Sequence, residues 1–175
     1  MRITALFALL LSFLSSCVFA QKNKTWPKVA DNSFNKRIQI FLSGSVPFIE
    51  VDSLAAKDLN DFIILDTRGK DEYMVSRIPG AVYVGPDFEI SQVKGLDQNK
   101  PVVVYCSIGY RSEKYGEDLK ENGFLNVFNL YGGIFEWVNS GQDVQNEEGK
   151  AIKNIHTYNA GWGKFVSNPH YKKIH

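Results

Sequence analysis

Short apolar runs, most of them bounded by polar or turn residues, recur along the chain from about residue 47 to residue 130. Such runs are typical of strands that are buried on both faces of a sheet. The predicted strands span residues 48–51, 62–65, 81–84, 101–105 and 126–130. The predicted helices span residues 54–59, 70–75, 112–122 and 134–138. Because strands alternate with helices through short connections, we expect an α/β fold in which helices cover both faces of a parallel sheet.

The segments on either side of this pattern are less regular. Residues 21–45 mix polar and aromatic residues, with a short helix predicted at about 32–42. The tail, residues 142–175, places large apolar residues among polar ones: Ile152, Ile155, Tyr158, Trp162 and Phe165. We expect this tail to pack against the domain, since five large apolar groups rarely stay in water. The alternative is a tail that binds a partner.

Composition and charge narrow the possible functions. The 175 residues carry a net charge of +1 and are 44% hydrophobic, which suits one globular domain with a core. No basic cluster indicates nucleic-acid binding, so small-molecule or protein chemistry is expected. His156, His170 and His175 have no ligand spacing with cysteines or carboxylates, so we expect neither a metal site nor a cofactor.

The first twenty residues have the layout of a secretory signal peptide. Arg2 supplies a positive charge, residues 3–14 are almost entirely apolar, and polar residues begin at Gln21. Cleavage after Ala20 would release a soluble periplasmic or secreted protein. Residues 14–17 also resemble a bacterial lipobox, in which Cys17 would be lipidated and would anchor the chain to a membrane. Either form places the domain outside the cytoplasm.

The chain has two cysteines, Cys17 and Cys106. Since Cys17 would be removed or lipidated, the mature domain would hold one free thiol in a compartment that favours disulfides. Such a cysteine is either reactive or a buried, inert apolar side chain.

The position of Cys106 favours reactivity. It ends a predicted buried strand just before a predicted helix, where backbone N–H groups and the helix dipole stabilise a thiolate. Gly109 lets the loop curl inward, and Arg111 adds a positive charge. A lowered pKa speeds attack only a few-fold, because nucleophilicity falls with pKa. The main contribution of such a loop is therefore to bind an anionic substrate or sulfur adduct.

Four sequence elements in order resemble the rhodanese family, over residues 46–141. They are Asp66-Thr67-Arg68 followed by Glu72-Tyr73; Arg77-Ile78-Pro79-Gly80-Ala81; the loop Cys106-Ser107-Ile108-Gly109-Tyr110-Arg111-Ser112; and residues 130–137, LYGGIFEW. The resemblance implies a rhodanese-like α/β fold, with a central five-stranded parallel sheet and helices on both faces. The implied organisation is a signal peptide (1–20, or a lipoprotein signal ending before Cys17), an N-terminal extension (21–45), the domain (46–141) and a C-terminal extension (142–175).

The same resemblance implies a sulfurtransferase of the thiosulfate sulfurtransferase type. Cys106 would take sulfur from a donor such as thiosulfate as a persulfide, and a thiol, cyanide or a protein thiol would accept it. The implied substrate-binding loop comprises Ser107, Ile108, Gly109, Tyr110, Arg111 and Ser112. The loop offers only Arg111 as a basic residue, and Ile108 and Tyr110 make its rim partly apolar. A larger or less charged donor is therefore a further hypothesis.

Asp66 and Arg68 allow two interpretations. They shape the charge of the loop, or they are structural, with Asp66 capping the next turn and Arg68 bonded to Asp71 or Glu72. Tyr131 and Trp137 are expected in the core.

Three other functions compete with sulfur transfer. Phosphatases and arsenate reductases of the related fold use a loop one residue longer between cysteine and arginine, so this loop suits sulfur better than phosphate. Persulfide or thiol redox relay would differ mainly in the acceptor. Binding modules of the family usually lack the cysteine that this chain retains.

Overall fold

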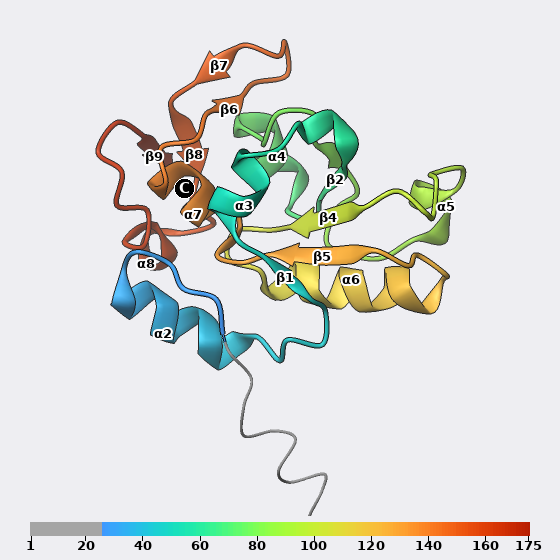
Figure 1. Cartoon of the computed structure of the whole chain (residues 1–175). Coiled ribbons are helices and arrows are strands. Elements are labelled where there is room, and N and C mark those ends of the chain that lie inside the picture. The colour runs from blue at the N-terminus through green and yellow to red at the C-terminus, as the bar shows by residue number, and fades with distance from the viewer. Residues whose placement is uncertain (1–25) are drawn as a thin grey trace, which may run out of the picture.

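The computed structural model describes residues 26–175; the predicted signal peptide and Cys17 lie outside this part of the chain. At the centre is a five-stranded parallel sheet with strand order β1-β5-β4-β2-β3 (Figure 1). Its strands are β1 (Phe48–Ile49), β2 (Ile63–Asp66), β3 (Val82–Tyr83), β4 (Val102–Tyr105) and β5 (Val127–Leu130). The predicted α/β class and five-stranded sheet are confirmed. No helix within residues 26–175 is long and apolar enough to span a membrane.

The central strand, β4, is buried on both faces. Val102 and Val104 belong to one hydrophobic cluster, and Val103 and Tyr105 belong to the other. Successive side chains of a strand point to opposite faces, so these two clusters are the two halves of the core. This double burial explains why the strand is a continuous apolar run in the sequence.

Helices supply the other side of each cluster. One face is covered by α6 (Tyr110–Glu121) and the short α5 (Ile90–Val93). The opposite face is covered by α2 (Asn32–Phe41), α3 (Val51–Ala55) and α7 (Gly133–Asn139). Helix α4 (Lys70–Val75) follows β2. Tyr131 and Trp137 are buried in the core, as expected.

The predicted helix at residues 54–59 is wrong in its bounds. Helix α3 begins at Val51 and ends at Ala55, and a separate 3₁₀ turn follows at Leu59–Asp61. Val51 and Leu54 are both buried, and their three-residue spacing places them on one helix face against the core. Strand β1 therefore stops at Ile49, and Glu50, rather than Asp52 or Ser53, precedes the helix.

The C-terminal segment adds two small sheets and a short helix. Their elements are β6 (Val144–Gln145), β7 (Ala151–Ile152), β8 (Asn154–His156), α8 (Ala160–Gly163) and β9 (Lys172–Ile174). Ile155 and Phe165 are buried in the same cluster as α2 and α7. Backbone hydrogen bonds between Arg77 and Gln145 also join the segment to the domain. In Figure 1, α8 lies beside α2, although the two helices come from opposite ends of the chain.

Candidate active site

Cys106 lies directly after β4, at the carboxyl end of the central strand, and is buried. Open α/β sheets form their sites at these strand ends. The chain curls back after Cys106, and the N–H of Gly109 donates a hydrogen bond to Sγ over 3.2 Å. Helix α6 begins at the next residue, Tyr110, two residues earlier than predicted. The sulfur therefore faces the N-terminal end of a helix, which favours negative charge.

Two glycines allow this loop shape. Gly109 has a φ of +113°, which side-chain-bearing residues rarely adopt. At Gly133, a Cβ would overlap the carbonyl oxygen of Cys106. The absence of that Cβ lets Ile134 N–H donate to Cys106 O over 3.0 Å and Phe135 N–H donate to Ser107 O over 3.2 Å. With these carbonyls held by α7, other backbone N–H groups of the loop are free to face the sulfur.

The electrostatics of the loop stabilise a thiolate. Burial raises the pKa of the Cys106 thiol, but the Arg111 charge and the N–H groups of Ser112, Ile108 and Gly109 lower it by more. The net pKa lies below the ordinary value of 9.0. Cys106 thus has more thiolate, the nucleophilic form of cysteine, than an exposed cysteine would have at the same pH.

Arg111 is held in a three-residue cluster with Glu72 and Ser107. Its Nη1 lies 2.7 Å from Glu72 Oε2, and its Nη2 donates to Glu72 Oε1 and to Ser107 Oγ, each over 3.0 Å. The Ser107 hydroxyl donates to Glu72 Oε1 over 2.9 Å. Burial raises the pKa of Glu72, but the hydrogen bonds and charge of Arg111 outweigh this and leave it lowered. The positive charge of Arg111 is therefore already paired.

Ser112 supports the loop from inside the fold. Its hydroxyl donates to Asn129 Oδ1 over 2.8 Å, and Asn129 Nδ2 donates to Gly109 O over 2.9 Å. All three residues lie beside the start of α6, and Asn129 and Ser112 are fully buried. Ser112 thus contributes its backbone N–H near Sγ, while its side chain belongs to the support of the loop.

Asp66 and Arg68 form a buried pair that does not line the site. Arg68 Nη2 lies 2.6 Å from Asp66 Oδ2 and donates to the carbonyl oxygen of Ser76 over 2.5 Å. The predicted bond from Arg68 to Asp71 or Glu72 is wrong: Arg68 pairs with Asp66, and Glu72 forms its ion pair with Arg111. Asp66 Oδ1 does cap the next turn by accepting the Arg68 N–H over 3.0 Å. Tyr105, the residue before Cys106, donates its hydroxyl to Asp66 Oδ2 over 2.6 Å, so this pair fixes the strand end.

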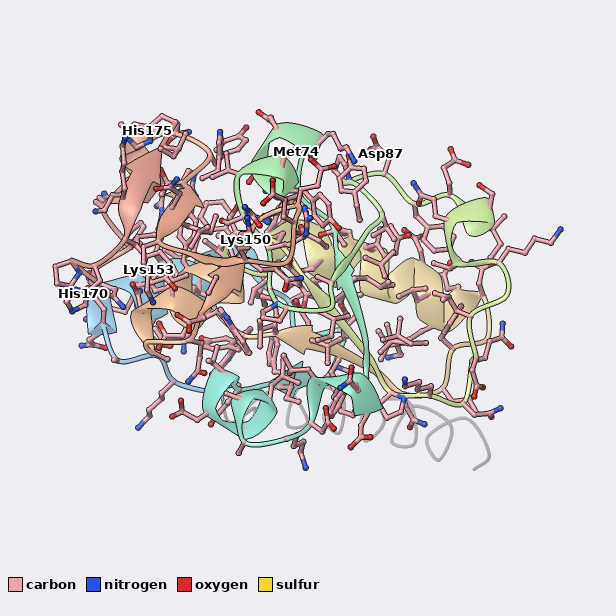
Figure 2. All side chains as sticks on the ribbon, turned by 90° about the horizontal axis from the view of Figure 1, so that it is seen from above. Met74, Asp87, Lys150, Lys153, His170 and His175 are labelled. Atoms are coloured by element: carbon pink, nitrogen blue, oxygen red, sulfur yellow. The ribbon has the colours of Figure 1, made fainter. Side chains whose placement is uncertain are left out.

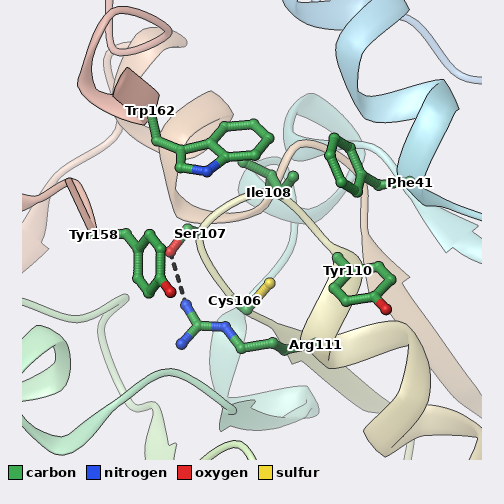
Figure 3. Close-up of a pocket in the computed structure, with 8 residues that line it drawn as sticks. All are labelled: Phe41, Cys106, Ser107, Ile108, Tyr110, Arg111, Tyr158 and Trp162. Atoms are coloured by element: carbon green, nitrogen blue, oxygen red, sulfur yellow. Dashed lines mark hydrogen bonds between the residues drawn. The ribbon is translucent and has the colours of Figure 1, made fainter. Parts of the chain in front are cut away.

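A pocket of about 300 Å³ opens above Cys106 (Figure 3). The loop contributes Cys106, Ser107, Ile108, Tyr110 and Arg111 to its lining. The remaining lining residues are Phe41 at the end of α2, and Tyr158 and Trp162 from the C-terminal segment. Figure 3 shows aromatic rings around the Cys106 sulfur, with Arg111 and Ser107 bonded to each other at one side.

The histidines lie apart from this pocket. His170 and His175 lie at the outer edge of the C-terminal segment (Figure 2). His156 Nε2 is 3.9 Å from Asp71 Oδ2, outside the pocket lining. Residues 26–175 contain no group of three or more histidine, cysteine or acidic side chains arranged to hold a metal ion.

Comparison with known proteins places this loop in a family. The family model described as Rhodanese-like domain matches residues 50–140, just over half of the chain. The chain belongs to the rhodanese-like domain family. The matched segment runs from the start of α3 to the end of α7 and includes the whole Cys106 loop.

Similar proteins differ in the activities that their names give. A tRNA uridine(34) hydroxylase of Cytophaga hutchinsonii is 32% identical over 117 residues, which cover 60% of this chain and 37% of the hydroxylase. The thiosulfate sulfurtransferase GlpE of Coxiella burnetii is 34% identical over 77 residues, 44% of this chain and 72% of that protein. A crystal structure of a rhodanese-like domain protein from Staphylococcus aureus is 27% identical, with a TM-score of 0.51 over 58% of this chain and 98% of that one. The chain thus spans well under half of the hydroxylase that it matches.

Several residues of the rhodanese-like site were not predicted as site residues. Glu72 was named only as one of two possible partners of Arg68, with Asp71 as the other. Asn129 is one polar residue in an apolar strand, a pattern that signals a specific buried hydrogen bond. Phe41, Tyr158 and Trp162 lie outside the matched segment and 50 or more positions away from Cys106 in the sequence. Tyr158 was expected to pack against the domain with the rest of the tail, but it is 57% exposed at the pocket. No local pattern could have placed these rings.

Proposed function

We propose that this chain is a sulfurtransferase that carries sulfane sulfur as a persulfide on Cys106. The observation that supports it is the Cys106 Sγ itself, which receives the Gly109 N–H at the end of β4 and has a lowered pKa. A thiolate held this way is a nucleophile, and the same N–H groups can hold the negative charge of a persulfide.

The proposed reaction has two half-reactions. In the first, the Cys106 thiolate attacks the outer sulfur of a donor such as thiosulfate, an S–S bond forms, and sulfite leaves with the electron pair of the broken bond. In the second, cyanide or a thiolate attacks the outer sulfur of the persulfide and restores the Cys106 thiolate. Each step conserves charge, and the scheme needs neither a metal nor a cofactor.

The structure also bears on phosphatase chemistry. Four residues separate Cys106 from Arg111, and the Arg111 guanidinium is bonded to Glu72 and Ser107. A phosphate dianion would need an unpaired arginine fork and a wider loop. These features favour a sulfur atom over a phosphate group as the species held in the loop.

The proposal is tested by intact-mass measurement after brief treatment with a sulfur donor. We expect the protein to gain one sulfur atom, to lose it on addition of cyanide, and to release thiocyanate in the same amount. Cys106→Ser is the inactive variant, and Ile40→Ala, an exposed residue outside the pocket, is the matched control. If neither thiosulfate nor an organic donor adds sulfur to the folded protein, sulfur transfer is the wrong function.

We also propose that the mature protein is exported. Its support is the sequence of residues 1–20 alone. The same mass measurement on protein expressed from the full chain distinguishes a start at Gln21 from a lipidated Cys17, and an uncleaved Met1 form in the cytoplasmic fraction would contradict export.

A further inference from the structure

The pocket above Cys106 is walled by aromatic rings that come mainly from the two extensions. Phe41 meets Trp162 edge-on with ring centroids 5.5 Å apart, and it meets Tyr110 in the same manner at 6.0 Å. The Tyr158 ring lies 5.6 Å from the Arg111 guanidinium carbon. Tyr110 is the only one of these rings that lies within the matched residues 50–140.

These rings are held in place from outside the pocket. The Arg37 guanidinium lies 5.1 Å from the Phe41 ring and 5.4 Å from the Trp162 ring, but Arg37 is not among the pocket-lining residues. The Phe165 ring supports Trp162 at 5.7 Å and is itself packed on Phe34 at 5.2 Å. Phe41 and Trp162 are thus held against the hydrophobic core that the extensions share with the domain.

The charge of the pocket is low. Of its eight lining residues, Arg111 is the one cation, and Glu72 neutralises its charge, while the Cys106 thiolate is the one anion. A dianion such as thiosulfate would approach the Cys106 thiolate with no unpaired cation among the lining residues to offset the repulsion. A monoanion whose remaining surface is apolar would meet less repulsion and would cover the rings.

We propose that the two extensions make this pocket selective for an organic sulfur donor, an arenethiosulfonate-like monoanion whose aromatic ring packs against Phe41, Trp162 and Tyr158. The proposal rests on the sulfur-transfer function proposed above. A volume of about 300 Å³ is at the small end of ligand pockets, which suits one substituted ring. The sulfane sulfur then lies at the loop, where the backbone N–H groups receive its charge.

The chemical step balances with this donor. The Cys106 thiolate attacks the outer sulfur of the thiosulfonate and forms the S–S bond of the persulfide. The bond between that sulfur and the sulfonyl sulfur breaks, and a sulfinate leaves with the electron pair. Two negative charges enter the step and two leave it.

The test compares two donors of the same reacting group. Single-turnover rates of persulfide formation are measured by mass for benzenethiosulfonate and methanethiosulfonate, which differ in the presence of the ring. We expect the second-order rate constant to be about tenfold or more higher for benzenethiosulfonate than for methanethiosulfonate. Burial of the donor's ring against the pocket walls contributes at least this factor. Each rate is divided by the rate of the same donor with free cysteine, which removes differences in intrinsic reactivity.

Variants locate the source of this preference. We expect Trp162→Ala and Phe41→Ala each to lower the ratio of the benzenethiosulfonate rate to the methanethiosulfonate rate at least about threefold. Each change removes one contact with the donor's ring. Only folded variants enter the comparison, because Cys106 of an unfolded chain would react with both donors like free cysteine and would lower the ratio by itself. Ile40→Ala, one residue before Phe41 but 71% exposed and outside the pocket, should keep the wild-type ratio.

A measurement on the unchanged protein provides a second readout. Benzenesulfonate, which has no sulfane sulfur, should slow alkylation of Cys106 by iodoacetamide at concentrations where methanesulfonate has no effect. Equal protection by the two sulfonates, or equal corrected rates with the two donors, would overturn the selectivity and leave sulfur transfer standing. Absence of a sulfur adduct from every donor would overturn the sulfur-transfer function, and the selectivity with it.

Discussion

Two arginine–carboxylate pairs lie near the end of the central sheet, and they differ in burial. Arg68 and Asp66 have fully buried side chains, with a shortest N–O distance of 2.6 Å. In the other pair the shortest distance is 2.7 Å, but the Arg111 side chain is 25% exposed and that of Glu72 only 3%. The first pair also bonds to Tyr105 and the backbone of Ser76, while the second bonds to Ser107.

The difference shows that the degree of burial gives two chemically similar pairs different roles. The buried pair can only organise the protein around it, and it fixes the strand end from which Cys106 emerges. The partly exposed pair lies at the pocket, where the Arg111 charge lowers the pKa of Cys106 while Glu72 limits attraction of further anions. Changes at the first pair should therefore affect stability, and changes at the second should affect acid stability and reactivity.

The largest expected effect follows from breaking the buried pair. Asp66→Ala should lower the free energy of unfolding by about 3–5 kcal/mol, because Arg68 is left as an uncompensated buried charge. Urea unfolding monitored by circular dichroism measures this loss. The double variant Asp66→Ala with Arg68→Met should lose less than the sum of the two single changes. Additive losses would show that the two side chains do not depend on each other.

Glu72→Gln should have a smaller effect, and one that depends on pH. At pH 7 we expect a loss of about 1.5–3 kcal/mol in the free energy of unfolding, the scale of hydrogen bonds to a charged group. Because folding lowers the pKa of Glu72, its stabilisation is present above the ordinary value of 4.5 and is lost as the pH falls through the lowered folded pKa. Urea unfolding of both proteins between pH 7 and pH 3 should show the difference shrinking with acid. If the difference in the free energy of unfolding between the two proteins stays constant from pH 7 to pH 3, the ionised pair is not its cause.

Arg111→Gln should change reactivity by a modest amount. Losing the Arg111 charge raises the pKa of Cys106, so the pH at which its alkylation rate reaches a plateau should move up. At pH 7 the rate should fall only about two- to fivefold, because a more basic thiolate is a better nucleophile. Iodoacetamide rates from pH 5 to pH 10 measure both effects. Arg111→Lys, which keeps the charge, should retain most of the low plateau pH.

Ser107→Ala should have the smallest effect of the four. It removes a hydroxyl that bonds to Glu72 and Arg111, while the direct bonds between those two remain. We expect about 0.5–1 kcal/mol less stability at pH 7 and no shift in the pH profile of Cys106 alkylation. A shift as large as that of Arg111→Gln would mean that Ser107 is what positions the arginine charge.

Much of the fold and the centre of the site could be predicted from local patterns. The apolar run of β4 that leads into Cys106, followed by Gly109 and a helix, predicted a cysteine at the C-terminal end of a buried parallel strand. Boundaries were less accurate, since α3 begins at Val51 because of the core beneath it. The suggested partners of Arg68, Asp71 or Glu72, were wrong because Arg68 and Arg111 both carry the right charge for Glu72, and sequence separation alone favoured the nearer arginine.

The sequence by itself determined the parallel sheet, the place of Cys106 at the carboxyl end of one of its strands, and the loop that lowers the pKa of the thiol. These features depend on hydrophobic period, glycine positions and helix starts, which act over a few residues. Tertiary structure alone decided which carboxylate meets Arg111 and which rings wall the pocket. Phe41 and Trp162 are over a hundred positions apart in the sequence. Only the packing of α2 and α8 on the same core brings their ring centroids to 5.5 Å from each other above Cys106.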